Sequence, residues 1–342
     1  MARPPGTRGK GVSRGGGGRG GGDRDRSGGR GRGSGRAPGG RGEGRRRDDK
    51  PNWEHMALPL PGKTAERLGR RPGRDDNVGL WLDKFVYRKL RDAAEPGRSS
   101  ADDDWSLTAA ARNFALSQFC TARTAASGAQ ALARRREALC ADDAPALEFE
   151  ATVNGRLLVD YGRANAVETT ISFHPVWGVP RIPGSALKGL CRAALERGQF
   201  AEEEQDIQEA DLVAILGDER AAGQVVFHDA LPADGAFELA LDVLTPHHGS
   251  YYGSEGKDPP GDWESPKPHT FLTVVNTTFV FHLSVCPYGE ARASTKENEA
   301  GKRWLGLACS GMRSALEWDG VGAKTSAGYG HFIAISEGKW LA

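Results

Sequence analysis

The segment from Gly320 to Gly330 has the residue types of a phosphate-binding loop. It reads Gly-Val-Gly-Ala-Lys-Thr-Ser-Ala-Gly-Tyr-Gly and lies between an expected helix and an expected strand. Glycine allows positive φ angles and lets a backbone approach a ligand closely. Lysine, threonine and serine add one cation and two hydroxyl groups, which suit phosphate oxygens. The predicted contact residues of this loop are Gly322, Lys324, Thr325, Ser326, Gly328, Tyr329 and Gly330.

Two familiar nucleotide-binding patterns do not fit this loop. A P-loop places Gly directly before Lys-Ser/Thr and continues into a helix. Here Ala323 precedes Lys324, and a strand is expected next. The dinucleotide fingerprint requires a following helix as well. A simple turn that holds no ligand remains the alternative interpretation.

A second candidate is the stretch that contains Pro183-Gly184-Ser185, which opens an expected helix. The unpaired N–H groups and the dipole at a helix start favour an anion. Lys188 lies one turn into the helix, and Arg192 follows at i+4 on the same face. We predict that Arg181, Ser185, Lys188 and Arg192 contact a ligand. The alternative is a capped helix whose basic side chains extend into solvent.

Helices and short strands are expected to position these residues. Asn77 is expected to cap a helix with Leu80, Leu82 and Phe85 on its apolar face. Residues 106–140 predict one or two further helices, whose Arg134–Arg136 run indicates a solvated face, with an RNA contact as the alternative.

From Leu147 onward the pattern alternates between short strands and helices. Helices are expected over 186–197, 206–216 (ending at Gly217) and 302–317. Strands are expected over 147–153, 157–159, 169–173, 179–182, 224–228, 237–244, 271–285 and 331–335. This order predicts an α+β fold with a ferredoxin-like core.

Composition divides the chain into a basic tail and an acidic body. Residues 1–50 hold 13 Arg and 2 Lys against 5 acidic residues, a charge of +10, so the rest of the chain carries −9. We predict a disordered Gly/Arg-rich tail over 1–50, a linker over 51–76 and one domain over 77–342, with a helical part at 77–145 and the core at 146–342. Such a tail suits single-stranded nucleic acid, and simple solubilisation is the alternative.

Targeting signals and cysteine pairing are not evident in the sequence. Five scattered cysteines without a C-x-x-C pair favour a reduced, cytoplasmic setting. The sequence also predicts no signal peptide and no membrane span.

Histidines and tyrosines gather in an expected loop over 245–270. The residues with RNA-binding potential there are His247, His248, Tyr251, Tyr252 and Lys267. They suit stacking and hydrogen bonding to nucleotides or contact with a neighbouring subunit. His228-Asp229 has the residue types of a metal pair, but further ligands lack recognisable spacing, and we interpret the pair as structural. We predict no catalytic residue, no metal and no cofactor.

Three motifs carry a resemblance to a known family. Ile182-Pro183-Gly184-Ser185-Ala186-Leu187-Lys188-Gly189 and the Gly-rich loop, in this order, resemble the signature of the RAMP superfamily, whose core is ferredoxin-like or RRM-like. Asp242-Val-Leu-Thr-Pro-His247, followed by a Tyr-rich loop and Asp262-Trp-x-Ser-Pro, is similar to the sixth RAMP subunit of type III-B (Cmr-type) CRISPR effector complexes. The resemblance covers residues 77–340 and excludes the tail.

This resemblance implies a non-catalytic subunit of an antiviral ribonucleoprotein complex. Its partners would be the guide RNA (crRNA), target RNA, other RAMP subunits and the small helical subunit, with no membrane. In such complexes target cleavage belongs to a different RAMP subunit. Two alternatives stay open: a metal-independent endoribonuclease that processes repeat RNA with His247 or His248, and a subunit that contacts mainly protein.

Overall fold

A computed structural model describes the chain over residues 56–57, 63, 76–84, 88–89, 113, 116–120, 126–141, 144–162, 171–201, 207–245, 248–254, 256–261, 263–264, 268–286 and 295–341. All of them belong to one compact unit, Asp49–Ala342. The predicted tail at 1–50 lies outside the described residues, as does most of the predicted linker. Two short strands near the start, β1 (Met56–Ala57) and β2 (Arg88–Lys89), pair with each other.

The larger sheet contains six strands and forms the centre of the fold. Its main path runs β10-β3-β9-β5, with β6 paired to β9 and β11 paired to β3, and every pair is antiparallel. The strands are β3 (Ala146–Asn154), β5 (Val225–Phe227), β6 (Leu231–Pro232), β9 (Thr278–Val285), β10 (His331–Ile333) and β11 (Lys339–Leu341). Helix and antiparallel sheet are thus mixed, which confirms the α+β prediction.

Two long helices pack on one face of this sheet. They are α5 (Gly184–Glu196) and α8 (Thr295–Trp318), and they contact each other. The first four residues of β3 are buried and burial alternates from Phe149 onward, where the Phe149 ring stacks on Phe281 with centroids 4.8 Å apart. The predicted inward residues are buried on α5, where only Leu190 is partly buried, and on α8: Leu187, Cys191, Ala194 and Leu195, and Leu305, Ala308, Cys309, Met312 and Leu316. Spacing of 3–4 residues therefore located both helix faces correctly.

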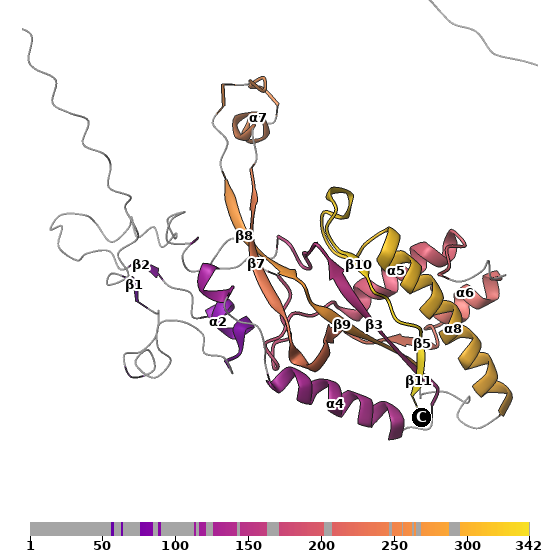
Figure 1. Cartoon of the computed structure of the whole chain (residues 1–342). Helices are drawn as coiled ribbons and strands as arrows, with labels where there is room; N and C mark the ends of the chain where they lie inside the picture. The colour runs from indigo at the N-terminus through magenta and orange to yellow at the C-terminus, as the bar shows by residue number, and fades with distance from the viewer. Residues whose placement is uncertain are drawn as a thin grey trace, which may run out of the picture. The chain divides into compact units, whose positions relative to one another are not determined.

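A smaller sheet of three strands forms a ribbon beside the larger one. Its order is β4-β8-β7, with β4 at Arg156–Leu157, β7 at Glu238–Leu244 and β8 at His269–Val275. Figure 1 shows β7 and β8 extending together to the short helix α7 (Gly249–Gly253) at the end of the ribbon.

The prediction of one strand over 271–285 is wrong. The run divides at Asn276, whose φ of 44° is left-handed, and its two halves join different sheets. The predicted strand at 331–335 is shorter, because Ala334 has a φ of 50°, and β11 was not anticipated.

Shorter helices complete the described part. Asn77 caps α2 (Val78–Lys84), since its Oδ1 accepts from the Leu80 N–H at 2.8 Å. On this helix Val78, Trp81 and Leu82 are buried. Leu80 is exposed, so its predicted place on the apolar face is wrong. Phe85 lies outside the described residues. Helix α6 (Glu209–Leu216) ends at Gly217 as predicted. Helix α4 (Ala126–Ala141) lies in the predicted helical stretch. None of the described helices is long and apolar enough to cross a membrane.

Candidate nucleic-acid interface

The Gly-rich loop, residues 320–330, is fixed by backbone hydrogen bonds at both of its ends. The Val321 N–H donates to the Gly330 carbonyl at 2.9 Å, which closes the loop on itself. The Gly330 N–H donates to the Arg156 carbonyl at 2.7 Å, and the Ala323 N–H donates to the Leu158 carbonyl at 2.7 Å. The loop is therefore anchored on the segment that contains β4.

Positive φ angles confirm the expected need for glycine in this loop. Gly322, Gly328 and Gly330 have φ values of 97°, 87° and 76°. A methyl group at Gly330 would lie 2.0 Å from the Val321 carbonyl oxygen, and one at Gly322 would lie 2.4 Å from the Leu158 carbonyl oxygen. At Gly328 a methyl group would meet nothing within 4 Å. The loop thus has a tightly packed inner side and an open side at Gly328.

The polar side chains of the loop differ in their surroundings. Lys324 adopts a left-handed φ of 61°, and its Nζ lies 5.4 Å from the centre of the Tyr161 ring. Thr325 and Ser326 belong to the short 3-10 helix η4 (Thr325–Ala327), where Ser326 is exposed. The Tyr329 hydroxyl donates to Asp242 Oδ2. Burial, together with this bond, raises the pKa of Tyr329 to about 12.

A carboxylate of the protein occupies the start of α5, which differs from the expectation of a start open to phosphate. Asp229 Oδ1 accepts from the Gly184 N–H at 2.8 Å, and its Oδ2 lies 2.7 Å from Arg181 Nη1. Burial raises the pKa of Asp229, but the Gly184 bond and Arg181 outweigh it and hold the pKa below its usual value. The predicted contact Arg181 is thus engaged within the protein.

The remaining predicted residues of α5 lie at the surface. Ser185 and Arg192 are exposed and Lys188 is half-buried. Arg192 lies 3.4 Å from Glu196 Oε1 and also donates to the Gly217 carbonyl. The start of α5 bonds to the segment after β5, whereas the Gly-rich loop bonds to β4 and β7, so the two motifs are held by different elements.

Aromatic side chains are exposed near the end of the ribbon. The Tyr251 and Tyr252 rings lie edge to face with centroids 5.3 Å apart, and Tyr252 is 74% exposed. His248 is partly buried, and its carbonyl accepts from the Tyr252 N–H. His247 and Lys267 lie outside the described residues. Trp263, 83% exposed, was not predicted, although the Asp-Trp motif contains it.

The interpretation of His228-Asp229 as a structural pair agrees with its contacts. The His228 Nε2 lies 2.9 Å from the Ser284 Oγ, while Asp229 bonds to α5. Within the described ranges, no three His, Cys, Asp or Glu side chains gather as metal ligands.

The prediction of a solvated arginine face on α4 holds only in part: Arg134 is exposed, yet all three arginines also contact other parts of the chain. Arg134 lies 5.7 Å from the Trp177 ring centre, and Arg135 donates to the Asp229 carbonyl. Arg136 holds both oxygens of Glu148, at 2.7 and 3.0 Å. Helix α4 is therefore tied to the face of the sheet opposite α5 and α8.

A buried histidine extends this arginine contact into the sheet. The His282 Nε2 lies 2.6 Å from Glu148 Oε2. Burial lowers the pKa of His282 to about 4, even though Glu148 acts to raise it. The imidazole is therefore neutral at pH 7 and donates its Nε2–H to the ionised carboxylate.

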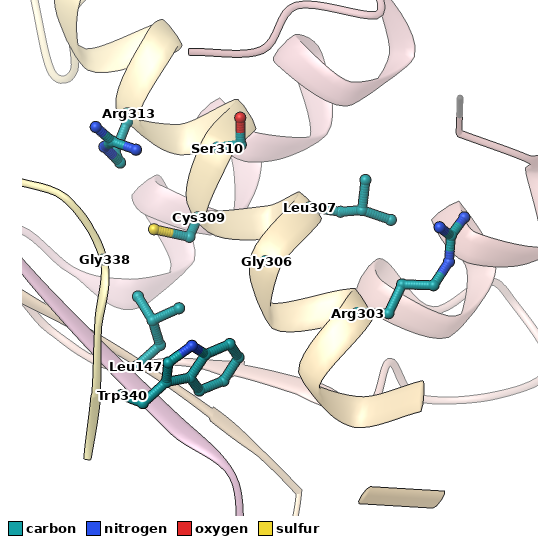
Figure 2. A pocket seen from close by; sticks show the side chains of 9 residues that line it. All are labelled: Leu147, Arg303, Gly306, Leu307, Cys309, Ser310, Arg313, Gly338 and Trp340. Carbon is teal, nitrogen blue, oxygen red and sulfur yellow. The ribbon is translucent and has the colours of Figure 1, made fainter. Parts of the chain in front are cut away.

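An open cavity of about 330 Å³ lies between α8 and the C-terminal segment. Figure 2 shows Leu147 and Trp340 on one side and the α8 residues Leu307, Cys309 and Ser310 on the other. Arg303 at its rim pairs with Asp211 at 2.7 Å. No predicted contact residue lines this cavity, so it is separate from the Gly-rich loop and from the start of α5.

Comparisons with known proteins give one consistent result. The sequence profile of the RAMP superfamily matches residues 150–333. CRISPR system Cmr subunit Cmr6 of Pyrococcus furiosus is 31% identical, over 52% of this chain and 65% of that protein. The Cmr6 subunit of Saccharolobus solfataricus is 29% identical, over 54% of this chain and 57% of that protein. The chain thus spans less than two thirds of the length of either relative.

A solved structure shares the fold. A chain from the cryo-EM structure of the type III-B Cmr-beta bound to cognate target RNA aligns with a TM-score of 0.52 and 22% identity. The alignment covers 67% of this chain and 72% of that chain.

Proposed function

The chain belongs to the RAMP superfamily, and we propose that it is a crRNA-binding structural subunit of a type III-B CRISPR complex, with no catalytic role of its own. The similarity to two Cmr6 subunits supports membership of such a complex. Its partners would be guide RNA, target RNA, other RAMP subunits and the small helical subunit, in the cytoplasm.

The order of elements in the larger sheet supports a ferredoxin-like core. Along the chain the order is β3-α5-β5-β9-α8-β10, the β-α-β-β-α-β sequence of that fold. In the sheet the strands lie as β10-β3-β9-β5, so that the first and third strands are central. A core of this kind leaves the Gly-rich loop between the second helix and the last strand.

The Gly-rich loop is the observation that carries the proposal. Its ends are pinned by backbone bonds, while Ser326 and Gly328 face solvent beside Lys324. This arrangement presents one cation, hydroxyl groups and an uncrowded backbone to an approaching phosphate. Phosphate contacts fix the position of an RNA without reading its bases. The loop therefore suits a subunit that must accept many guide sequences.

Filter binding at several salt concentrations, with two unrelated guide RNAs, tests this proposal. Lys324→Ala should weaken binding about equally for both guides and lower the salt slope by roughly one unit. Lys339→Ala is the control: it also removes one lysine charge, but the exposed Lys339 lies in β11, opposite Glu148 in the strand pairing and at the far end of β3 from the loop. Equal affinities and slopes for wild type and Lys324→Ala would remove the loop from the RNA site and favour a mainly protein-contacting subunit.

A second experiment separates binding from catalysis. Replacing His247 and His248 by Ala should leave target-RNA cleavage by the assembled complex unchanged. The purified chain should also leave labelled repeat RNA intact without metal. A loss of roughly 100-fold in cleavage with assembly preserved, which is typical of a missing acid or base, would favour the endoribonuclease alternative.

A further inference from the structure

Asp242 joins the Gly-rich loop to the ribbon through a single carboxylate oxygen. Its Oδ2 accepts from the Tyr329 hydroxyl and lies 3.2 Å from Arg156 Nε. Asp242 belongs to β7, Arg156 to β4 and Tyr329 to the loop. Three segments that are distant in the sequence therefore meet at one side chain.

Arg156 is engaged by the protein on several sides. Its Nη1 donates to the Leu241 carbonyl at 3.1 Å and to Thr273 Oγ1 at 3.0 Å. The Thr273 hydroxyl donates onward to the Ala240 carbonyl, and Thr273 is fully buried. The Arg156 carbonyl accepts from the Gly330 N–H. These contacts direct the guanidinium into the ribbon and make Arg156 a part of the scaffold.

The surroundings of Lys324 also connect to the ribbon, through Tyr161 and strand β8. The Lys324 ammonium group sits over the Tyr161 ring, and that ring packs edge-on against Phe271 of β8 with centroids 5.4 Å apart. The Lys324 carbonyl accepts from the Tyr329 N–H at 3.3 Å. Tyr329 is thus bonded to Asp242 by its side chain and to Lys324 by its backbone.

We infer that Asp242 is a positioning residue, which holds Tyr329 and Arg156 so that the Gly-rich loop presents Lys324 in a binding-ready conformation. The inference rests on the proposed RNA-binding role of the loop. Ordering a loop residue costs conformational entropy, and a loop that is already ordered spares RNA that cost. A loop released from the ribbon would spend part of its time in conformations that cannot bind, and apparent affinity falls by that fraction.

Two substitutions test the bond from its two ends. Tyr329→Phe keeps the ring and removes the hydroxyl, and Asp242→Asn removes the negative charge. Each should weaken RNA binding about threefold to tenfold, the population shift expected for one lost hydrogen bond. Asp211→Asn is the matched control, because Asp211 also pairs with an arginine, Arg303 at 2.7 Å, but lies in α6. It should bind RNA like wild type.

A double substitution distinguishes positioning from direct contact. If Tyr329 acts through Lys324, then Tyr329→Phe should have no further effect on RNA affinity in the Lys324→Ala background. Additive losses would mean that Tyr329 touches RNA itself, and they would overturn the inference. Thermal melts within about 4 °C of wild type would show that the domain remains folded.

Amide hydrogen exchange on the full chain without RNA tests positioning independently of binding. Peptides that cover 320–330 should exchange faster in Tyr329→Phe and Asp242→Asn than in wild type and Asp211→Asn. Unchanged exchange in both variants would overturn the inference, whatever their RNA affinities are. If exchange accelerates while Lys324→Ala binds RNA like wild type, the loop is positioned by Asp242 but the proposed RNA site is wrong. The two failures are therefore distinguishable.

Discussion

Two glycines of the Gly-rich loop form a matched pair for substitution by alanine. Gly328 and Gly330 have similar positive φ angles, 87° and 76°. Their surroundings differ, because a methyl group at Gly330 would lie 2.0 Å from the Val321 carbonyl oxygen while one at Gly328 would meet nothing within 4 Å. Comparing Gly330→Ala with Gly328→Ala therefore separates close packing from backbone strain.

The expected costs follow from these two differences. A left-handed φ costs alanine about 1–2 kcal/mol in either position. The lower entropy of the unfolded alanine chain offsets about 0.4–1 kcal/mol of this cost. Gly328→Ala should thus lower the free energy of unfolding by about 1 kcal/mol. Gly330→Ala must also disturb the bonds from Val321 N–H and to the Arg156 carbonyl, at about 0.5–1.5 kcal/mol each. Its total cost should be about 2–4 kcal/mol.

Urea unfolding followed by tryptophan fluorescence measures both values. The midpoint should fall further for Gly330→Ala, with the slope m unchanged in both variants. Equal costs for the two substitutions, or a neutral Gly330→Ala, would refute the close packing of Gly330 against the Val321 carbonyl.

Three further predictions concern the rest of the molecule. The folded pKa of His282 is about 4, against 6.5 for the ordinary side chain, so the fold resists its protonation. Its contribution to the free energy of unfolding should be fully present above pH 6.5 and fall by about 3 kcal/mol toward pH 4. Urea unfolding across this range should show that decrease, and His282→Asn should flatten it. Asp229→Asn weakens a charge-assisted bond to the Gly184 N–H and the ion pair with Arg181. It should lower the free energy of unfolding by about 1–3 kcal/mol in urea, and an unchanged value would contradict the capping role of Asp229. Deleting residues 1–50 should leave the melting temperature unchanged and weaken RNA binding mainly at low salt, and a lowered melting temperature would contradict the predicted independence of the tail.

Local signals made the helices and the glycine loop predictable from sequence. The inward faces of α5 and α8 follow from apolar spacing alone, and Asn77 and Gly217 act within one turn of the helix that each bounds. The positive φ angles of the Gly-rich loop follow from its composition. In these cases the partners of a residue lie within a few positions of it.

Contacts between distant segments account for what the sequence did not reveal. Arg136 follows two other arginines on a helix, and nothing nearby indicates that Glu148 receives it. Asp229 caps a helix that begins 45 residues earlier. The apolar run 271–285 gives no local reason to change sheets except Asn276. The Arg156–Asp242–Tyr329 contacts likewise depend on three elements that only the fold brings together.

The central claim is that the Gly-rich loop contacts guide RNA within a type III-B complex. Photo-crosslinking of a reconstituted complex, assembled on guide RNA that carries photoreactive nucleotides, tests this claim most directly when the crosslinked peptides are identified by mass spectrometry. The account predicts crosslinks to peptides that cover 320–330, with two unrelated guide sequences, and fewer of them in Tyr329→Phe. A complex that assembles with this chain but yields no crosslink to that loop would contradict it.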